Sequence, residues 1–337
     1  MNDIKTILGE YNRLGIGDQI DYAKFYLYSI ITHSTAIEGS TVTEIENRLL
    51  FDDGIGAQKP LLEQAMNLDL KSAYEQSIVH AREHTDYTVE LLCSLSALVM
   101  KNTGSDYSTM LGNFSAAKGE LRLLNVSAGI GGKSYLSYQK IPSRLQEFCR
   151  WLNAERKRLN TSDIDSIYDL SFEAHYRLVN IHPWTDGNGR MSRLVMNMIQ
   201  YEFGMVPSIV KKDNRKQYIH SLEQSEAEEN SRTFKAFMLQ HHCGNLLKQI
   251  EEYKHSMGDN SHSATYLGTM DGTMALRILE TVRTEPSITM DSLSDTLGIP
   301  RRTLVRYMNR LQEENKIRRV GGRRYGHWEI IEEGDAH

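Results

Sequence analysis

The chain has 337 residues, of which 40% are hydrophobic and 25% charged, and its formal net charge is −5 at pH 7. These values are typical of a globular protein with two or three domains. A net negative charge argues against a surface that binds polyanions throughout, so any contact with nucleic acid has to be local. No apolar run approaches the roughly 20 residues of a membrane span, and we expect no membrane contact.

Three cysteines, Cys93, Cys149 and Cys243, are far apart in the chain. Each lies in an apolar helical context, and none has the spacing of a zinc ligand. The first residues lack the charged-then-apolar pattern of a secretion signal. We therefore expect reduced thiols in the core of a cytoplasmic protein.

Helical periodicity runs through most of the chain, which holds only six prolines. Thr43 and Glu46 form the pattern of a capping box, which predicts the start of a helix. Apolar residues also recur at helical spacing in residues 20–35, 60–85, 86–102, 140–158, 162–179, 190–204, 214–227 and 231–256. An all-α fold is therefore expected over this part of the chain.

Two pairs of histidines have alternative interpretations. His80 and His84 lie four residues apart on a predicted helix, as two zinc ligands often do. The zinc-peptidase pattern needs Glu after the first His, but this chain has Ala81 there, so we favour ordinary helix residues. His241 and His242, near a helix end, are expected to be solvated or to cap the helix.

Residues 119–139 interrupt the helical pattern. Gly129, Gly131 and Gly132 separate two short stretches whose side chains favour strands. We interpret this segment as a β-hairpin, with a long irregular loop as the alternative.

Residues 182–193 read HPWTDGNGRMSR and lead into a predicted helix. Gly187, Asn188 and Gly189 favour a tight turn, and the N–H groups at a helix start that follows such a turn attract anions. Arg190 and Arg193 lie three apart, so both project to one side of the first helical turn, and their guanidinium groups suit phosphate oxygens.

Two more residues of this segment carry chemistry. Asp186 offers a carboxylate of the kind that holds phosphate-bound Mg²⁺. His182 has an ordinary pKa near neutrality and is suited to take a proton from a nucleophile. Each part alone is commonly a packing feature, but packing has no need for all of them within twelve residues.

The C-terminal part has a different pattern. Residues 257–272 are rich in Gly, Ser, Asp and Thr and predict a linker. Helices predicted at 273–284, 289–297 and 301–314 precede a hairpin around Gly321 and Gly322, which resembles the winged-helix family. Residues 301–324 contain nine Lys and Arg but two acidic residues. Such a basic patch favours phosphates, so Arg301, Arg302 and Arg306 are expected DNA contacts. The alternative is a domain that packs on protein partners.

Residues 182–193 resemble the signature of the Fic family of AMP-transferring enzymes, H-P-F-x-[D/E]-G-N-G-R-x-x-R. The one departure is Trp184, where Phe is usual, and we expect its ring to be buried behind the loop. The resemblance implies an all-α Fic fold with a small β-hairpin flap, followed here by the winged helix-turn-helix domain. It also implies transfer of AMP from ATP to a Ser, Thr or Tyr hydroxyl of a target protein or of the chain itself.

The resemblance further implies residue roles. His182 is the catalytic base, Asp186 holds Mg²⁺, and Tyr218 lines the adenine pocket. The hairpin flap holds the target protein by strand pairing. Phosphate contacts fall to Gly187, Asn188 and Gly189, with Asn188 on the α-phosphate, to Arg190 for the β-phosphate and to Arg193 for the γ-phosphate.

Residues 34–39, STAIEG, match the family's inhibitory pattern [S/T]-x-x-x-E-[G/N] through Ser34, Glu38 and Gly39. The resemblance implies a salt bridge from Glu38 to Arg193 that occupies the place of the ATP γ-phosphate. The alternative is a surface charge beside a helix-ending glycine.

These interpretations divide the chain into an N-terminal helical region with the inhibitory motif (1–105), a catalytic core (106–256), a linker (257–272) and a winged helix-turn-helix domain (273–337). Two other functions stay open. One is removal of AMP from a modified protein, and the other is nucleotide-responsive regulation of transcription through DNA binding. A homodimer is also compatible with the sequence.

Overall fold

The computed structural model describes residues 3–127, 134–258, 278–297, 301–313, 316–321 and 326–331. The chain divides into two compact units, residues 1–13 with 26–248 and residues 14–25 with 249–337. The first unit holds most of the predicted N-terminal region and catalytic core, and the second holds the predicted winged helix.

The chain up to residue 258 is mainly helical, as predicted. Apart from α1, every helix had been predicted, and the bounds agree to within a few residues. The helices are α1 (Ile4–Arg13), α2 (Tyr22–Ile37), α3 (Glu44–Asp53), α4 (Leu61–Arg82), α5 (Val89–Val99), α6 (Ile141–Arg158), α7 (Ile164–Ile181), α8 (Asn188–Glu202), α9 (Arg215–Ala227) and α10 (Arg232–Gly258).

Side-chain caps begin several of these helices, but not α8. The predicted capping box of Thr43 and Glu46 starts α3. The Thr88 side chain caps α5, and the Asp163 side chain caps α7. No side chain caps α8, which follows Gly187 in a left-handed conformation with φ 81°. The N–H groups of its first turn therefore depend on a group from elsewhere in the chain, or on a ligand.

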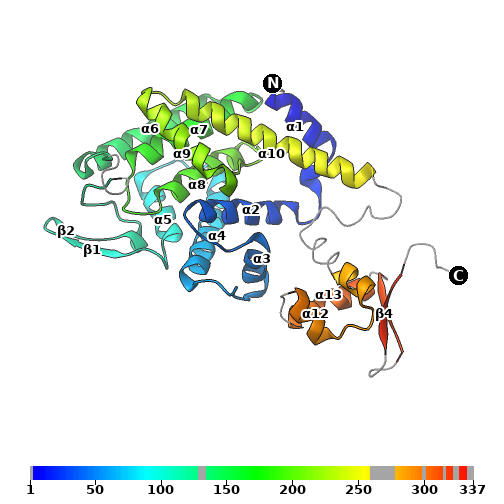
Figure 1. The fold of residues 1–337 in the computed structure, drawn as a ribbon. Coiled ribbons are helices and arrows are strands. Elements are labelled where there is room, and N and C mark those ends of the chain that lie inside the picture. The colour runs from blue at the N-terminus through cyan, green and yellow to red at the C-terminus, as the bar shows by residue number, and fades with distance from the viewer. Residues whose placement is uncertain are drawn as a thin grey trace. The chain divides into compact units, whose positions relative to one another are not determined.

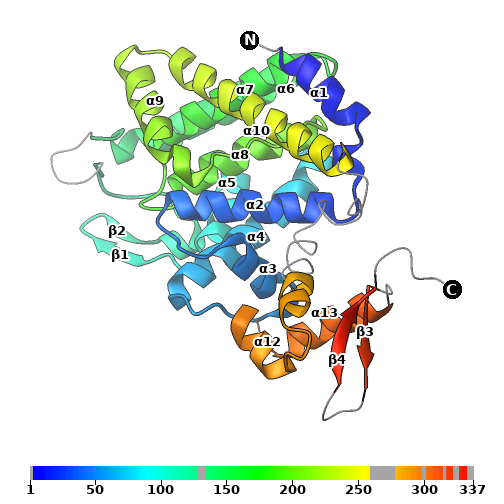
Figure 2. The same ribbon diagram turned by 45° about the vertical axis from the view of Figure 1, so that its right-hand side comes forward.

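Helix α8 lies at the centre of the first unit, between α7 and α4 (Figures 1 and 2). Twelve of its fifteen residues are buried, so the helix is enclosed on nearly all sides. Its buried amide side chains are hydrogen-bonded. The Asn197 side chain accepts from the Tyr74 hydroxyl at 2.7 Å, and the Gln200 side chain accepts from the Ser208 backbone amide at 2.7 Å. Tight enclosure fixes the position of the first turn of α8.

The first unit also contains a hairpin that we did not predict. Strand β1 (Asp106–Thr109) pairs antiparallel with β2 (Gly112–Ser115) around an exposed turn. Strands of four residues without alternating apolar side chains leave little trace in a sequence.

The hairpin predicted over residues 119–139 is present in its described part. Ser127 forms an antiparallel bridge with Ser134, and the Tyr135 amide donates to the Val126 carbonyl at 3.1 Å. The glycines predicted to form its turn, at 129, 131 and 132, lie outside the described residues. We call residues 120–139 the flap.

The winged helix-turn-helix elements are confirmed. Helical residues at 278–284 precede α12 (Met290–Leu297) and α13 (Arg301–Glu313). Strand β3 (Ile317–Val320) then pairs antiparallel with β4 (His327–Ile330). Gly322, expected in the turn between them, lies outside the described residues. Apolar side chains from all these elements form one core, which includes Ile278, Leu293, Leu304, Leu311, Ile317 and Trp328.

One histidine prediction is wrong. His242 is neither solvated nor a cap: it is buried, its ring lies 4.7 Å from that of Tyr168, and burial lowers its pKa to about 3. The sequence had placed His242 near a helix end, but α10 continues to Gly258 and His242 packs against Tyr168 of α7. In contrast, His80 lies on α4 as expected and contacts Gln76 and Thr85, whereas His84 lies beyond the end of α4, with its Nδ1 3.1 Å from Glu202 Oε1.

All three cysteines are free thiols, and Cys149 is buried as expected, whereas Cys93 and Cys243 are partly exposed. Among the residues that the structure describes, no helix combines the length and the apolar character needed to cross a membrane.

Candidate active site

His182 lies at the end of α7 in a left-handed conformation, with φ 52° and ψ 61°. This geometry is uncommon for a residue with a side chain and indicates a position that its surroundings enforce. Its Nδ1 lies 3.3 Å from the Val179 carbonyl, which favours a proton on Nδ1 and leaves Nε2 as the basic nitrogen. The ring of Tyr135 stacks on the imidazole with 3.7 Å between centroids and 17° between planes.

Arg122 joins the flap to this histidine. Its buried guanidinium donates to the carbonyl of His182 at 2.9 Å and to the carbonyls of Leu124 at 2.6 Å and Leu136 at 2.5 Å. The Arg122 amide also donates to the Pro183 carbonyl at 3.1 Å. One side chain therefore links both arms of the flap to the residue expected to act as base.

Two buried side chains, those of Trp184 and Asn188, stabilise the loop after His182. Trp184 is fully buried, as expected, and its indole N–H donates to the Gly119 carbonyl at 3.0 Å. The Asn188 side chain accepts from the Trp184 amide at 3.1 Å and donates to the Trp184 carbonyl at 2.9 Å. Both ends of the Asn188 amide thus close the loop. The contact of this side chain with a phosphate stays a prediction.

Asp186 and Arg190 lie beside the start of α8. The Asp186 side chain is 64% exposed; one of its oxygens accepts from the Gly187 amide at 2.6 Å and the other lies 3.7 Å from Arg190. Arg190 is buried, and its guanidinium donates to the Val99 carbonyl at 3.3 Å and to Met100 Sδ at 3.1 Å. Burial lowers the pKa of Arg190, against the opposing effect of Asp186.

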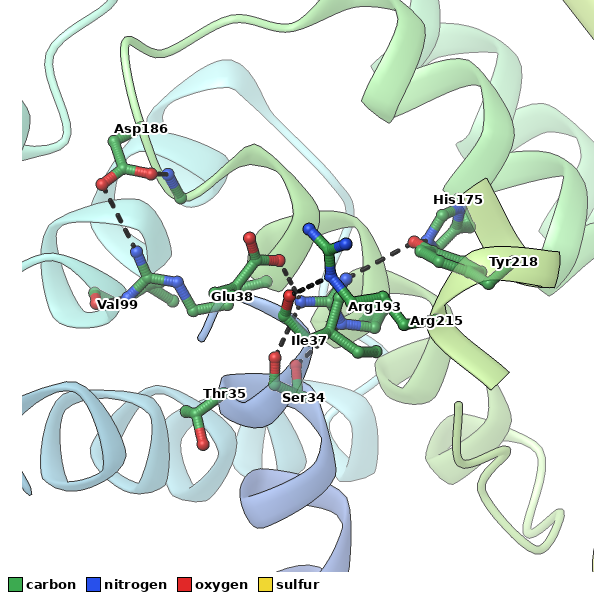
Figure 3. Close-up of polar contacts among 12 residues, drawn as sticks. Ser34, Thr35, Ile37, Glu38, Val99, His175, Asp186, Arg193, Arg215 and Tyr218 are labelled. Carbon is green, nitrogen blue, oxygen red and sulfur yellow. Dashed lines mark hydrogen bonds and ion pairs between the residues drawn. The ribbon is translucent and has the colours of Figure 1, made fainter. Parts of the chain in front are cut away.

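The predicted salt bridge between Glu38 and Arg193 is present (Figure 3). Arg193 Nη2 donates to Glu38 Oε1 at 2.6 Å and to the Ser34 carbonyl at 3.0 Å, and Nε donates to Ser34 Oγ at 2.8 Å. Ser34 and Glu38 of the inhibitory motif therefore bind one guanidinium together. Gly39 has φ 107° and ends the helix, so the helix-ending role that we considered as an alternative coexists with the salt bridge.

The carboxylate of Glu38 lies directly against the first turn of α8. A Cβ placed on Gly189 would be 2.6 Å from Glu38 Oε1 and 3.1 Å from Arg193 Nη1. Only glycine leaves space for the ion pair at this position. Glu38 thus places a negative charge at the helix start that has no side-chain cap, where the helix dipole favours an anion.

The two charges of this pair stabilise each other. Burial would raise the pKa of Glu38, but the Arg193 guanidinium outweighs it and, with Arg190 and Arg215, lowers the pKa. Burial would likewise lower the pKa of Arg193, but the carboxylate of Glu38 raises it overall. Both groups are therefore ionised at neutral pH.

Tyr218 contacts Arg193 instead of an open surface. Its hydroxyl is buried, lies 2.8 Å from His175 Nε2 and accepts from Arg193 Nη1 at 3.4 Å. Its place in an adenine pocket stays a prediction. Sequence reasoning missed His175, although it lies on α7, the helix that leads to His182.

The expected DNA contacts lie in the second unit. The Arg301 side chain is 64% exposed and its Nε lies 2.7 Å from Asp291 Oδ1. Arg302 and Arg306 belong to the same helix, α13, and their side chains lie outside what the structure describes.

We expect Glu38→Gln to lower the free energy of unfolding at pH 7 by about 1–2 kcal/mol, because it leaves Arg193 buried without its counter-ion. The effect is not larger because solvent partly screens the exposed side of the carboxylate. The folded-state pKa of Glu38 lies below its ordinary value of about 4.3. Its contribution is therefore complete above that value and is lost as the pH falls through the lower, folded-state pKa.

Urea unfolding of both proteins between about pH 8 and pH 3 measures this difference. The difference in unfolding free energy between the two proteins should stay constant down to about pH 5 and then fall to zero. Glu223→Gln, on the exposed face of α9, serves as the control and should have the unfolding free energy of the parent protein. A difference that persists unchanged to the lowest pH would contradict the assignment.

Comparison with known proteins identifies two domains. Residues 86–200 match the Fic/DOC family, and residues 274–318 match the winged helix-turn-helix DNA-binding family. The chain is 31% identical to protein adenylyltransferase Fic of Drosophila grimshawi over 197 residues, which cover 57% of this chain and 37% of that protein. It is 27% identical to protein adenylyltransferase fic-1 of Caenorhabditis elegans over 201 residues, which cover 59% of this chain and 36% of that protein. The matches thus span little more than a third of each relative.

The fold also resembles that of a Fic domain-containing signaling protein from Bacteroides thetaiotaomicron, with a TM-score of 0.62 and 19% sequence identity. This match covers 74% of the present chain and 96% of the bacterial one. Residues 86–200, which contain residues 182–193 of the site, thus match a Fic domain, and residues 274–318 match a winged helix-turn-helix domain.

Proposed function

We propose that this chain is a protein adenylyltransferase, which transfers AMP from ATP to a Ser, Thr or Tyr hydroxyl of a target protein and of itself. We further propose that the form described above is inhibited by Glu38. The relatives named protein adenylyltransferase support the activity. The contacts of His182, Arg190 and Arg193 support the assignment of roles.

The observation that carries this proposal is the position of the Glu38 carboxylate. It binds a buried arginine and lies against a helix start without a side-chain cap. Surroundings that hold a carboxylate oxygen also suit a phosphate oxygen, because both are anions that accept hydrogen bonds. An ATP γ-phosphate bound to Arg193 would compete with Glu38 for the same guanidinium.

The proposed reaction is a displacement at the α-phosphorus. His182 Nε2 takes the proton of the target hydroxyl, and the oxygen forms a bond to the α-phosphorus. The bond from that phosphorus to the bridging oxygen of the β-phosphate breaks, pyrophosphate leaves, and AMP stays on the target. The N–H groups at the start of α8, Arg190 and Arg193 hold the phosphates, so catalysis rests on positioning and on stabilisation of charge.

Asp186 fits a single protein ligand for Mg²⁺. Its carboxylate is mostly exposed, and its hydrogen bond to the Gly187 amide holds it beside the phosphate site. No cluster of three or more metal-binding side chains occurs in the described parts of the chain. Mg²⁺ in phosphate-transfer sites often has one or two carboxylates, with substrate phosphates and water as the other ligands. When bound, the ion would neutralise phosphate charge and orient the substrate.

The flap supports the choice of a protein as acceptor. Arg122 anchors both of its arms beside His182, and Tyr135 covers one face of the imidazole. An extended segment that pairs with the flap would bring its hydroxyl next to His182. Because strand pairing uses main-chain groups, this arrangement requires little of the target sequence beyond the acceptor itself.

His182→Ala should lower AMP transfer at least about 100-fold, the usual lower limit for loss of a general base. The measurement is labelling of protein from ATP that carries the label on its α-phosphate. His220→Ala, an exposed histidine on α9, provides the matched control and should keep the parent rate. Labelling that survives in His182→Ala would refute the base assignment.

Glu38→Gly should raise self-modification about 5- to 150-fold, the range expected when one inhibitory contact is lost. Intact-mass spectrometry measures the added AMP, and the double variant Glu38→Gly/His182→Ala should show none. The same proteins decide between addition and removal of AMP. If the chain mainly removes AMP with Glu38 aligning a water, Glu38→Gly should instead abolish release from a modified target and leave labelling low.

A second candidate function is DNA binding by the winged helix. The family match and the exposed Arg301 favour it. Arg301→Ala should weaken binding to duplex DNA and reduce the salt dependence by about one phosphate contact. Fluorescence anisotropy over a salt series measures both, with Lys140→Ala in the Fic domain as the control. Absence of binding even at low salt would indicate a protein adaptor.

A further inference from the structure

Helix α9 contacts Arg193 through Tyr218, and through Arg215 it contacts Ile37, the residue before Glu38 (Figure 3). Arg215 is the first residue of α9, and Tyr218 follows one turn later. Residues three apart in a helix lie on the same side, so both side chains face the ion pair from one element.

Arg215 holds the helix that carries Glu38. Its Nε donates to the carbonyl of Ile37 at 2.7 Å, and Ile37 is the last residue of α2. The final carbonyls of a helix have no partner within the helix, and a cation there is favourable. The carbonyl that Arg215 binds belongs to the residue directly before Glu38. This contact therefore fixes the position of the inhibitory carboxylate.

Tyr218 holds Arg193 from the opposite side. A guanidinium can only donate, so the Tyr218 hydroxyl accepts from Arg193, and its own proton is directed to Nε2 of His175. His175 is fully buried and close to Arg193, which keeps its ring neutral and able to accept. The chain of contacts thus runs from α8 through α9 into α7.

The partners of Arg193 fall into two groups. The Ser34 hydroxyl, the Ser34 carbonyl and the Glu38 carboxylate all belong to α2 or to the residue after it. The Tyr218 hydroxyl is held by α9 and α7. If a nucleotide displaces Glu38, the contact with Tyr218 does not depend on α2 and can persist.

We propose that α9 positions both sides of this switch. Arg215 positions Glu38 in the inhibited form, and Tyr218, supported by His175, positions Arg193 for the γ-phosphate when Glu38 has left. This inference rests on the proposed function, because ATP defines the second form. The two residues therefore act in opposite directions: loss of Arg215 favours ATP binding, and loss of the Tyr218 hydroxyl weakens it.

The first test compares Arg215→Ala with Lys216→Ala, its exposed neighbour on α9. Arg215→Ala should increase amide hydrogen exchange across residues 34–40 and raise self-modification about three- to tenfold, as expected for one lost charged hydrogen bond near the surface. In the Glu38→Gly background it should change neither ATP affinity nor rate. Unchanged exchange in Arg215→Ala, or equal effects of both substitutions, would overturn the role of Arg215.

The second test measures Tyr218→Phe in the Glu38→Gly background by calorimetric titration with ADP and with a non-hydrolysable ATP analogue. Affinity for the analogue should fall about three- to tenfold, the usual effect of one lost hydrogen bond, while affinity for ADP stays unchanged. Equal losses for both nucleotides would mean that Tyr218 contacts the nucleoside, and no loss would mean that it is only structural. Either result overturns its proposed role.

Tyr168→Phe supplies the matched control for a lost buried hydroxyl. The Tyr168 hydroxyl donates to the Val206 carbonyl at 2.8 Å, away from Arg193. Tyr168→Phe should lower the thermal midpoint in the same way as Tyr218→Phe and leave both affinities unchanged.

Hydrogen exchange and nucleotide titration do not require catalysis. If Glu38→Gly fails to label protein while these measurements behave as expected, the proposed reaction is wrong and the positioning roles stand. If labelling occurs but Arg215→Ala and Tyr218→Phe behave like their controls, the positioning roles are wrong.

Discussion

The start of one buried helix is the constraint on which the site depends. Helix α8 is enclosed on nearly all sides, yet its first turn has no side-chain cap and follows Gly187. Buried N–H groups and a helix dipole require a negative charge close by. In this form the chain provides it from Glu38, whose partner Arg193 lies 155 residues further along the chain. The same property supports the proposed phosphate site.

The rest of the site fixes the position of this helix start relative to His182. Trp184 is buried and bonded to Gly119, the Asn188 amide closes the loop on Trp184, and Arg122 binds the His182 carbonyl. One of these side chains, that of Asn188, had been expected to contact a phosphate and here bonds the backbone of Trp184. Their combined effect is to hold His182 and the proposed phosphate site at a fixed separation, which the proposed displacement at phosphorus requires.

The proposed inhibitory contact is built from charged groups, so a charged ligand can compete with it. The Glu38 carboxylate is about one-third exposed, whereas Arg193 is buried, so the carboxylate is the partner that solvent or a nucleotide can reach. A phosphate that replaces it keeps the arginine neutralised and avoids the cost of a buried, unpaired cation. Under the proposed function, inhibition and nucleotide binding would thus alternate on one guanidinium without disturbing the core.

The sequence alone determined the elements and the chemical groups. Helical periodicity, the capping box of α3, the HPWTDGNGRMSR segment and the STAIEG segment were all readable, because local spacing records backbone geometry and side-chain type. The hairpin at residues 106–115 and the burial of His242 were not readable, because strand pairing and neighbouring helices decide them. Only the tertiary structure brought Ile37, Arg215, Tyr218 and His175 around the ion pair, since contacts between residues far apart in sequence depend on how α2, α7, α8 and α9 pack.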